Sequence, residues 1–332
     1  MNRILIIRLS SFGDILLTTL AVRCIRKRFP SAHIDFVTRT PYVSLMSGNP
    51  YVNSVVALDV KNLAEVLRVR KKIRGQYDLI VDLHVNFRTY LLSLFTGAVT
   101  IRTKRFDFKR RLMALFHTKG KGALLPVPLR HLSGLKKVGV VDDGGGIEFS
   151  PPPDSVMAAK TLLLSHHIRD GYIVLSPGSR WLTKEWPKEK FAELISLMPQ
   201  ERFVILGGRQ DEATGKMLET VDRTRVVSLC GKTDPASAGE VIRRAKAVLT
   251  NDSGLMHMAT AVGIPVVAIF GCTVQEFGFA PFRGKSIVLE RDLKCRPCAT
   301  KGRKECPLGT LECLTSITAD DAADALESLP GK

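Results

Sequence analysis

The sequence lacks a long uninterrupted hydrophobic segment. The longest run without Asp, Glu, Lys or Arg extends from Ser253 to Gln275, and it contains Gly254, Gly263 and Pro265. These residues interrupt an apolar helix, so the run predicts a helix followed by a strand rather than a membrane-spanning segment.

Two signatures are missing from the N-terminus. Arg8 and Asp14 interrupt the first apolar stretch, which excludes a typical secretory signal peptide. Gly13 stands alone where the dinucleotide fingerprint G-x-G-x-x-G needs three glycines, and this disfavours a Rossmann oxidoreductase. The chain has 332 residues, 45% of them apolar, without low-complexity segments. We therefore expect a soluble cytoplasmic protein of two domains.

Acidic residues are few relative to basic ones. The chain has 49 Lys and Arg against 32 Asp and Glu, a formal net charge of +17. Such an excess favours an anionic partner, which could be nucleic acid, an anionic membrane surface or a phosphorylated substrate.

The most informative stretch runs from Ala247 to Ala259. A short apolar run ends in Thr250-Asn251-Asp252-Ser253-Gly254, and an apolar segment of helical periodicity follows. This order predicts a strand, a tight loop and a helix with Asp252 or Ser253 as its N-cap. The first helix amides and a glycine without a side chain would suit a bound phosphate, and His257 could add a donor.

A similar pattern opens the chain. Residues 3–8 predict a buried strand, residues 9–14 a loop, and residues 15–29 a helix that ends before Pro30. Asp14 follows the carboxyl edge of the first strand, where open α/β sheets bind ligands. The carboxylate could simply complement the helix dipole, or it could accept a proton from a substrate hydroxyl.

The second half repeats the strand, loop and helix order. The loop after the strand 172–176 carries Ser179, Arg180, Thr183 and Lys184, hydroxyls and cations that suit a diphosphate. The next strand leads into a glycine turn, 207–212. There Gln210 and Glu212 are candidate partners for ribose hydroxyls or a base, although either could instead cap the following helix.

A dense basic segment lies in the first half. Residues 102–111 hold six cations with two phenylalanines between them. We expect an exposed helix that docks an anionic lipid or sugar phosphate, although a solvated basic face is the simpler alternative. The six candidates are Arg102, Lys104, Arg105, Lys109, Arg110 and Arg111.

Glycines and prolines mark one composition break, at residues 142–146 and 150–153. We take it as the linker between a domain of residues 1–150 and a domain of residues 151–318. Residues 319–332 are expected to form a C-terminal helix.

These motifs together resemble glycosyltransferase family 9, the bacterial lipopolysaccharide heptosyltransferases. The resemblance covers nearly the whole chain. It rests on residues 8–14, on 177–179 with 183–187, on Gly207-Gly208 and on residues 251–257.

The resemblance implies an α/β protein of the GT-B fold, with two Rossmann-like parallel-sheet domains facing across a cleft. It also implies an acceptor site in the N-terminal domain, a nucleotide-sugar site in the C-terminal domain, and a C-terminal helix that packs back towards the N-terminal domain. The implied donor is ADP-heptose, and the implied acceptor is the anionic, phosphorylated inner core of lipopolysaccharide.

By the same resemblance, Asp14 matches the proposed general base and Lys184 the phosphate-binding lysine. The family's usual acidic ribose contact falls on Gln210 here. The chemistry expected is an inverting transfer that needs neither a metal nor a cofactor, on the cytoplasmic surface of the inner membrane. The expected substrate-binding residues are Ser10, Ser11, Gly13, Ser179, Arg180, Thr183, Gly207, Gln210, Asp252, Ser253, Gly254, Leu255, Met256 and His257.

Four of the seven cysteines form a cluster: Cys295, Cys298, Cys306 and Cys313. In a reducing compartment this pattern is closer to a structural zinc site than to disulfides. The last two are separated more widely than zinc ligands usually are, so we assign no metal.

Three other functions stay open. The charge alone would fit a nucleic-acid-binding protein, but no nucleic-acid motif accompanies it, and we expect no such partner. A non-catalytic nucleotide-sugar sensor would have the same fold without needing Asp14 and Lys184. A transferase for another nucleotide sugar or a non-lipid acceptor would keep the same site.

Overall fold

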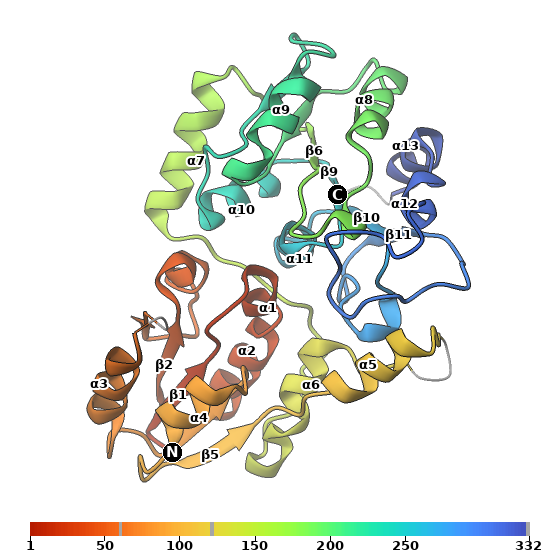
Figure 1. The fold of residues 1–332 in the computed structure, drawn as a ribbon. Helices are drawn as coiled ribbons and strands as arrows, with labels where there is room; N and C mark the ends of the chain where they lie inside the picture. Colours follow the sequence, from red (N-terminus) through yellow and green to blue (C-terminus); the bar gives the residue numbers. More distant parts are fainter. Residues whose placement is uncertain (60–61, 120–122, 330–332) are drawn as a thin grey trace. The chain divides into compact units, whose positions relative to one another are not determined.

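The computed structural model describes residues 1–59, 62–119 and 123–329. The chain divides into two compact units, each built on a parallel β-sheet (Figure 1). Unit 1 comprises residues 1–105 and 127–153, and unit 2 comprises residues 106–126 and 154–332. The described helices include none that is both long and apolar enough to cross a membrane.

Unit 1 contains a five-stranded sheet in the order β3-β2-β1-β4-β5. Its strands are β1 (Arg3–Ile7), β2 (His33–Thr38), β3 (Ser54–Ala57), β4 (Leu79–Asp82) and β5 (Val99–Arg102). Its helices are α1 (Phe12–Leu16), α2 (Thr19–Arg28), α3 (Leu63–Ile73), α4 (Phe87–Ser93) and α6 (Val127–Ser133), with 3₁₀ turns η1 (Thr40–Leu45) and η2 (Leu135–Val138).

Unit 2 contains a six-stranded sheet in the order β11-β10-β9-β6-β7-β8. Its strands are β6 (Ile173–Ser176), β7 (Phe203–Ile205), β8 (Val226–Ser228), β9 (Ala247–Asn251), β10 (Val266–Phe270) and β11 (Ser286–Glu290). Its helices are α5 (Asp107–Leu115), α7 (Pro153–Ser165), α8 (Lys188–Leu197), α9 (Glu212–Glu219), α10 (Pro235–Arg243), α11 (Gly254–Ala261), α12 (Glu312–Thr315) and α13 (Ala319–Glu327), with turns η3 (Leu182–Lys184), η4 (Arg209–Asp211) and η5 (Gln275–Phe277).

Both strand orders are those of Rossmann-like sheets, with the chain moving outward from a central pair in each direction. The expected α/β class with two parallel sheets is confirmed. In each sheet the central strands are buried, for example Ile4–Ile7 in unit 1 and Val266–Phe270 in unit 2. Continuous apolar strands of this kind are typical of parallel sheets covered on both faces.

The first helix differs from the sequence expectation. The predicted helix 15–29 begins earlier, at Phe12, and is interrupted at Leu17 and Thr18. The hydroxyl of Thr18 donates to Ile15 O at 2.6 Å, and that of Thr19 donates to Leu16 O at 2.8 Å. Threonine hydroxyls that bond back to the preceding turn compete with the helical ladder, which accounts for the division into α1 and α2.

The predicted linker is anchored on unit 1. Asp143 accepts hydrogen bonds from Arg23 Nε at 2.7 Å and Arg23 Nη2 at 2.9 Å, and it pairs with Lys27 at 2.7 Å. A Cβ on Gly48 would lie 2.4 Å from Ser150 O, so this glycine lets the chain pass closely. The glycine-rich stretch therefore belongs to unit 1, and the chain enters unit 2 after Pro153.

The units differ from the predicted domains in two further respects. Residues 106–126 belong to unit 2, because Met113 and Leu124 pack with Val274 and Phe277 in one apolar cluster. The C-terminal helix α13 packs against α8 and the β9–β11 strands of unit 2, where Figure 1 shows it in blue beside α8. Residues 330–332, the end of the predicted C-terminal segment, lie outside the described residues.

Candidate active site

The loop after β1 brings Arg8 and Asp14 together in unit 1. Arg8 Nη2 lies 2.7 Å from Asp14 Oδ1, and Arg8 Nε donates to Ser10 O at 2.9 Å. Ser11 caps α1, and its hydroxyl and amide donate to Asp14 Oδ2 at 2.7 and 3.2 Å. An arginine and a capping box therefore fix the plane of a carboxylate that keeps about a quarter of its side chain exposed.

The half-buried His84 and the buried His131 lie near this ion pair. Burial lowers the pKa of His84 to about 4, and the charge of Arg8 adds to this effect. Burial likewise lowers the pKa of His131 to about 3, with Arg8 again contributing. Both imidazoles are neutral near pH 7, so the charged groups of this loop are Arg8 and Asp14. The sequence analysis did not single out either histidine.

In unit 2, Lys184 pairs with Asp252 at the carboxyl edge of the sheet. Lys184 Nζ lies 2.5 Å from Asp252 Oδ2 and 3.3 Å from the carbonyl oxygen of the same residue. Thr273 Oγ1 donates to Asp252 Oδ2 at 2.7 Å. Burial acts to raise the pKa of Asp252, but Lys184, Thr273 and His257 together outweigh burial and lower it. Asp252 is thus an anion that holds the lysine ammonium in place.

Asn251, at the end of β9, holds the loop that carries Lys184. Its Nδ2 donates to Pro177 O at 2.7 Å, and its Oδ1 accepts from Trp186 N at 3.0 Å. The buried Trp186 ring donates to Ile317 O at 3.0 Å. Sequence reasoning gave no role to Asn251 or Thr273, although each is a polar residue at or just beyond the end of a buried strand.

The N-cap of α11 is one of the two residues predicted for it. Ser253 is the N-cap residue, but its side chain makes no capping bond to the helix and its hydroxyl lies 3.1 Å from Thr250 Oγ1. Gly254 and Leu255 are partly exposed, whereas Met256 and His257 are buried. The side chain of Met256 is fully covered by the core, so its predicted part in ligand binding would fall to its backbone.

Asp211 lies beside Gln210, the residue to which the resemblance gave the ribose contact. Its carboxylate accepts from Gly208 N at 2.8 Å, and Gln210 Nε2 donates to it at 3.1 Å. A Cβ on Gly178 would lie 2.3 Å from Asp211 Oδ1, and one on Gly207 would lie 2.6 Å from Asp211 Oδ2. The two glycines therefore make room for a buried carboxylate, and the exposed Gln210 lies beside it.

A second carboxylate belongs to the same region. Glu185 Oε1 accepts from Ser179 N at 3.2 Å. Burial raises the pKa of Glu185, and the charge of Asp211 raises it further. Burial also raises the pKa of Asp211. Paired carboxyls with raised pKa values are frequent at ligand sites, and the residue spacing gave no signal that Asp211 would be buried.

Two other predicted contacts are placed differently. Thr183 is buried, and its Oγ1 accepts from Arg303 N at 2.8 Å and donates to Arg303 O at 3.2 Å. It therefore holds the cysteine-rich loop rather than facing solvent. Arg180 is exposed, with its guanidinium 5.4 Å from the centroid of the Trp181 ring.

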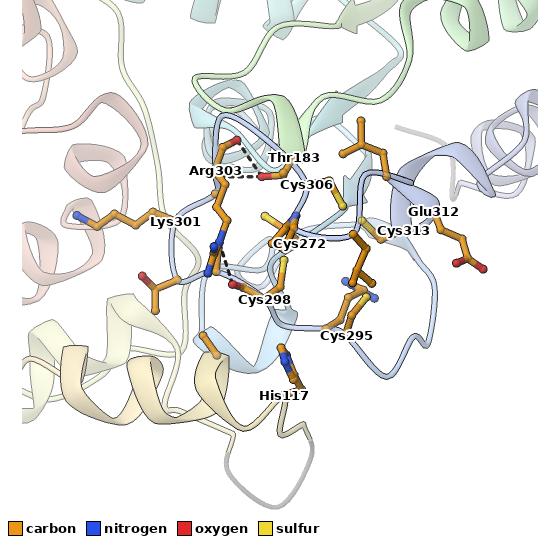
Figure 2. A pocket seen from close by; sticks show the side chains of 18 of the residues that line it. His117, Thr183, Cys272, Cys295, Cys298, Lys301, Arg303, Cys306, Glu312 and Cys313 are labelled. Atoms are coloured by element: carbon orange, nitrogen blue, oxygen red, sulfur yellow. Dashed lines mark hydrogen bonds between the residues drawn. The ribbon is translucent and has the colours of Figure 1, made fainter.

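The cysteine-rich loop encloses a cavity of about 620 Å³ within unit 2 (Figure 2). Its wall includes Cys272, Cys298, Thr183 and, from the α5 segment, Leu115 and His117. All seven cysteines are free thiols. Among the described residues, no group of three or more His, Cys, Asp or Glu side chains is arranged to hold a metal ion.

Arg296 connects this loop to the lysine site. Its buried guanidinium donates to Thr273 O at 2.7 Å, to Phe270 O at 3.3 Å and to Gly271 O. It also pairs with Glu290 at 2.8 Å. These bonds fix the segment after β10 that presents the Thr273 hydroxyl to Asp252.

The six predicted basic residues divide between the units and do not form one helix. Arg102 lies at the end of β5, 4.2 Å from the Tyr90 ring centroid, and donates to Ser93 Oγ at 2.8 Å. Lys104 and Arg105 are exposed in the following loop of unit 1. On α5, Arg110 pairs with Asp107 and turns towards Phe279, whereas Lys109 and Arg111 are exposed.

Comparison with known proteins finds similarity to heptosyltransferases along most of the chain. Residues 150–308 match the model of the family described as glycosyltransferase family 9 (heptosyltransferase). Lipopolysaccharide heptosyltransferase 3 of Escherichia coli K12 is 25% identical over 282 residues, covering 80% of this chain and 81% of that protein. Lipooligosaccharide heptosyltransferase 2 of Haemophilus influenzae is 26% identical and aligns over 99% of both chains.

Solved structures share the fold. The family 9 glycosyltransferase of Veillonella parvula superposes with a TM-score of 0.81 at 24% identity, covering 98% of this chain and 96% of that one. The E. coli ADP-heptose heptosyltransferase II superposes with a TM-score of 0.75 at 22% identity, covering 99% of this chain and 98% of that one. E. coli heptosyltransferase WaaC with ADP-2-deoxy-2-fluoro heptose superposes with a TM-score of 0.70 at 20% identity, covering 98% of this chain and 99% of that one. The chain is therefore a glycosyltransferase with the two-domain α/β fold of these enzymes, and its residues 150–308 match the family 9 model.

Proposed function

We propose that this enzyme transfers a heptose from ADP-heptose to the inner core of lipopolysaccharide with inversion at the anomeric carbon. The observation that carries the proposal is the Lys184–Asp252 pair beside the first turn of α11. A cation and helix amides at the carboxyl edge of a parallel sheet make a site for a diphosphate. The similarity to WaaC, whose structure contains an ADP-heptose analogue, supports the same donor here.

Lys184 can bind the donor without leaving Asp252. A lysine ammonium has three donors, and Asp252 receives two of them through its carboxylate and its carbonyl. The third would reach a phosphate oxygen. As the glycosidic bond to phosphate breaks, the leaving diphosphate keeps the electron pair, and Lys184 with the α11 amides stabilises the added charge.

Asp14 is the proposed general base. It takes the proton of the acceptor hydroxyl, whose oxygen attacks the anomeric carbon from the face opposite the diphosphate. The products are the inverted glycoside and ADP, and Asp14 then releases its proton to solvent. Arg8 and Ser11 hold the carboxylate plane during this step. In this proposal Ser10 and Gly13 line the acceptor side, and the cations of the reaction come from the protein, without a metal.

Asp211 and Glu185 are proposed to bind the donor's sugar and nucleoside hydroxyls in place of Gln210 alone. Burial raises the pKa of both carboxyls, and the Gly207-Gly208 turn lies against Asp211, which accepts from Gly208 N. The acceptor is proposed to be an anionic, phosphorylated, lipid-linked sugar at the cytoplasmic face of the inner membrane. The net charge of +17 supports this partner.

Calorimetric titration tests the donor assignment. ADP and ADP-heptose should bind more tightly than UDP and UDP-sugars in the absence of divalent cations. Incubation with ADP-heptose and a heptose-deficient core acceptor should then give a product one heptose heavier by mass spectrometry, with inverted anomeric configuration by NMR. Tighter binding of uridine compounds would leave the fold assignment unchanged and show that the donor is a UDP-sugar. Binding without transfer to any acceptor would favour a nucleotide-sugar sensor.

A further inference from the structure

Helix α5 has two opposite apolar faces. One face packs inside unit 2, where Met113 joins the cluster of Leu124, Val274 and Phe277. The other face carries Phe108, Leu112, Leu115 and Phe116, which are between 37% and 75% exposed. The positions 108, 112 and 115 follow the i, i+4, i+7 spacing of one helix face, and Phe116 continues it at the C-cap. A helix that only covered the core would carry polar residues there.

Cations border this second face. Lys109 and Arg111 lie on either side of the apolar positions and are exposed. Neither makes a hydrogen bond or ion pair with another residue in the described part of the chain, whereas Arg110 is held on the packed side by Asp107 and Phe279. Four apolar side chains between two available cations match the interface of an anionic bilayer, where the rings enter the acyl boundary and the cations meet the headgroups.

The apolar surface extends beyond the helix. Leu115 and Arg111 also line the 620 Å³ cavity, as does the exposed Leu308. The same lining includes the cations Lys301 and Arg303, which Figure 2 labels. Because α5 and this loop both belong to unit 2, the proposed face and this cavity lie within one compact unit.

Other exposed apolar residues are less suited to this role. On α4 and just after it, Tyr90 and Phe95 are stacked under Arg102 and Arg70 at 4.2 and 5.9 Å. On α7, Met157 and Leu164 are exposed, and the acidic Asp154 lies in the first turn of that helix. Helix α4 also exposes Phe87 next to the exposed Arg88, but α5 places its four exposed apolar side chains between two exposed cations, Lys109 and Arg111.

We propose that the α5 face formed by Phe108, Leu112, Leu115 and Phe116, with Lys109 and Arg111, docks on an anionic lipid bilayer. This inference deepens the proposed function, because an enzyme acting on a lipid-linked acceptor gains from residence at the membrane surface. It does not depend on which sugar or nucleotide the enzyme uses.

Vesicle flotation of the full-length protein tests the proposal. The protein should float with vesicles of equal parts phosphatidylcholine and phosphatidylglycerol, and not with phosphatidylcholine alone. Phe108→Ser with Phe116→Ser should lower the bound fraction by at least about tenfold, because two rings no longer leave water. Phenylalanine and serine have similar helix propensities, so α5 should stay folded. The matched control is Met157→Ser with Leu164→Ser on α7, which should float like the wild type.

The contribution of the cations and the depth to which the apolar face enters the bilayer can be measured independently. Lys109→Gln with Arg111→Gln should weaken binding by on the order of tenfold, and this difference should vanish at high salt. A Trp in place of Phe108 should be quenched by lipids brominated in their acyl chains. Equal flotation of the Phe108/Phe116 variant and the wild type, or no quenching of the new Trp, would overturn the proposal. If the wild type were a dimer and the Phe108/Phe116 variant a monomer, the face would bind a second copy of the chain and not a bilayer.

The proposed function can fail separately. ADP-heptose binding, and transfer to a detergent-dispersed acceptor, should be unchanged in the Phe108/Phe116 variant. Flotation without any heptosyl transfer would support membrane docking and contradict the proposed reaction. Transfer without flotation would support the reaction and contradict membrane docking.

Discussion

Lys184 and Asp252 form a 2.5 Å ion pair at the carboxyl edge of the unit 2 sheet, with Thr273 bonded to the same carboxylate oxygen. The pair joins two loops that are far apart in sequence, one after β6 and one after β9. Because a buried anion holds the ammonium group, the site is charged and ordered before any donor arrives.

Replacing Lys184 with Ala should lower kcat by about 10² to 10³, since the leaving diphosphate loses its cation. Steady-state kinetics with saturating ADP-heptose would measure this. The matched control is Lys188→Ala, an exposed lysine at the start of α8, which should keep wild-type turnover. Comparable kcat values in the two variants would remove Lys184 from the catalytic step.

Replacing Asp14 with Asn should nearly abolish turnover while ADP-heptose still binds, because the amide retains the shape of the side chain but cannot accept the acceptor's proton. Single-turnover transfer and donor calorimetry, measured on the same preparation, separate the two effects. Asp154→Asn changes another first-turn aspartate and should have wild-type rates. Wild-type turnover of Asp14→Asn would show that another group is the base.

Replacing Asp143 with Asn should destabilise unit 1 by about 2 kcal/mol, because Arg23 loses its bidentate partner in a largely buried position. The side chain of Arg23 holds the pKa of Asp143 well below its usual range. The stabilisation is therefore fully present above the ordinary aspartate pKa of about 4, and it is lost as pH falls through the lower folded value.

Thermal unfolding of Asp143→Asn and wild type across this pH range would test the sign. The two melting temperatures should differ most near neutrality and converge in acid. Asp142→Asn, at the neighbouring exposed position, serves as the control. A difference that grows on acidification would contradict the ion-pair explanation.

Replacing Gly178 with Ala should cost about 1–3 kcal/mol, since the added methyl overlaps the Asp211 carboxylate. A double-mutant cycle with Asp211→Ala tests this cause directly. In the Asp211→Ala background the same Gly178 change should cost much less, because the crowded oxygens are gone. Equal costs in both backgrounds would place the strain in the backbone at Gly178 instead.

The sequence predicted those features that depend on local order. Buried strands followed by polar loops located Asp14, Lys184 and Asp252 at sheet edges, since apolar periodicity and turn residues are properties of consecutive residues. Asp211 and Thr273 were missed because their importance comes from partners that only the fold supplies: Gly178 for one and Asp252 for the other.

The basic segment shows the same limit. Its charges are evident in the sequence, but the division after Arg105 depends on where the following residues find apolar partners. Met113 packs with Val274 and Phe277, more than 150 residues later in the chain. No local pattern encodes that pairing, so the sequence predicts one helix for the segment. In the structure it is a strand end, a loop and a helix, divided between two units.

The chain passes between its units after Arg105, after Pro126 and after Pro153. This threefold crossing bears on any attempt to exchange modules between related enzymes. A hybrid joined once near residue 150 would place α5 from one parent against Val274 and Phe277 from the other. We expect functional hybrids to need residues 106–126 and the C-terminal module from the same parent. The segment and the residues it packs against would then come from one protein.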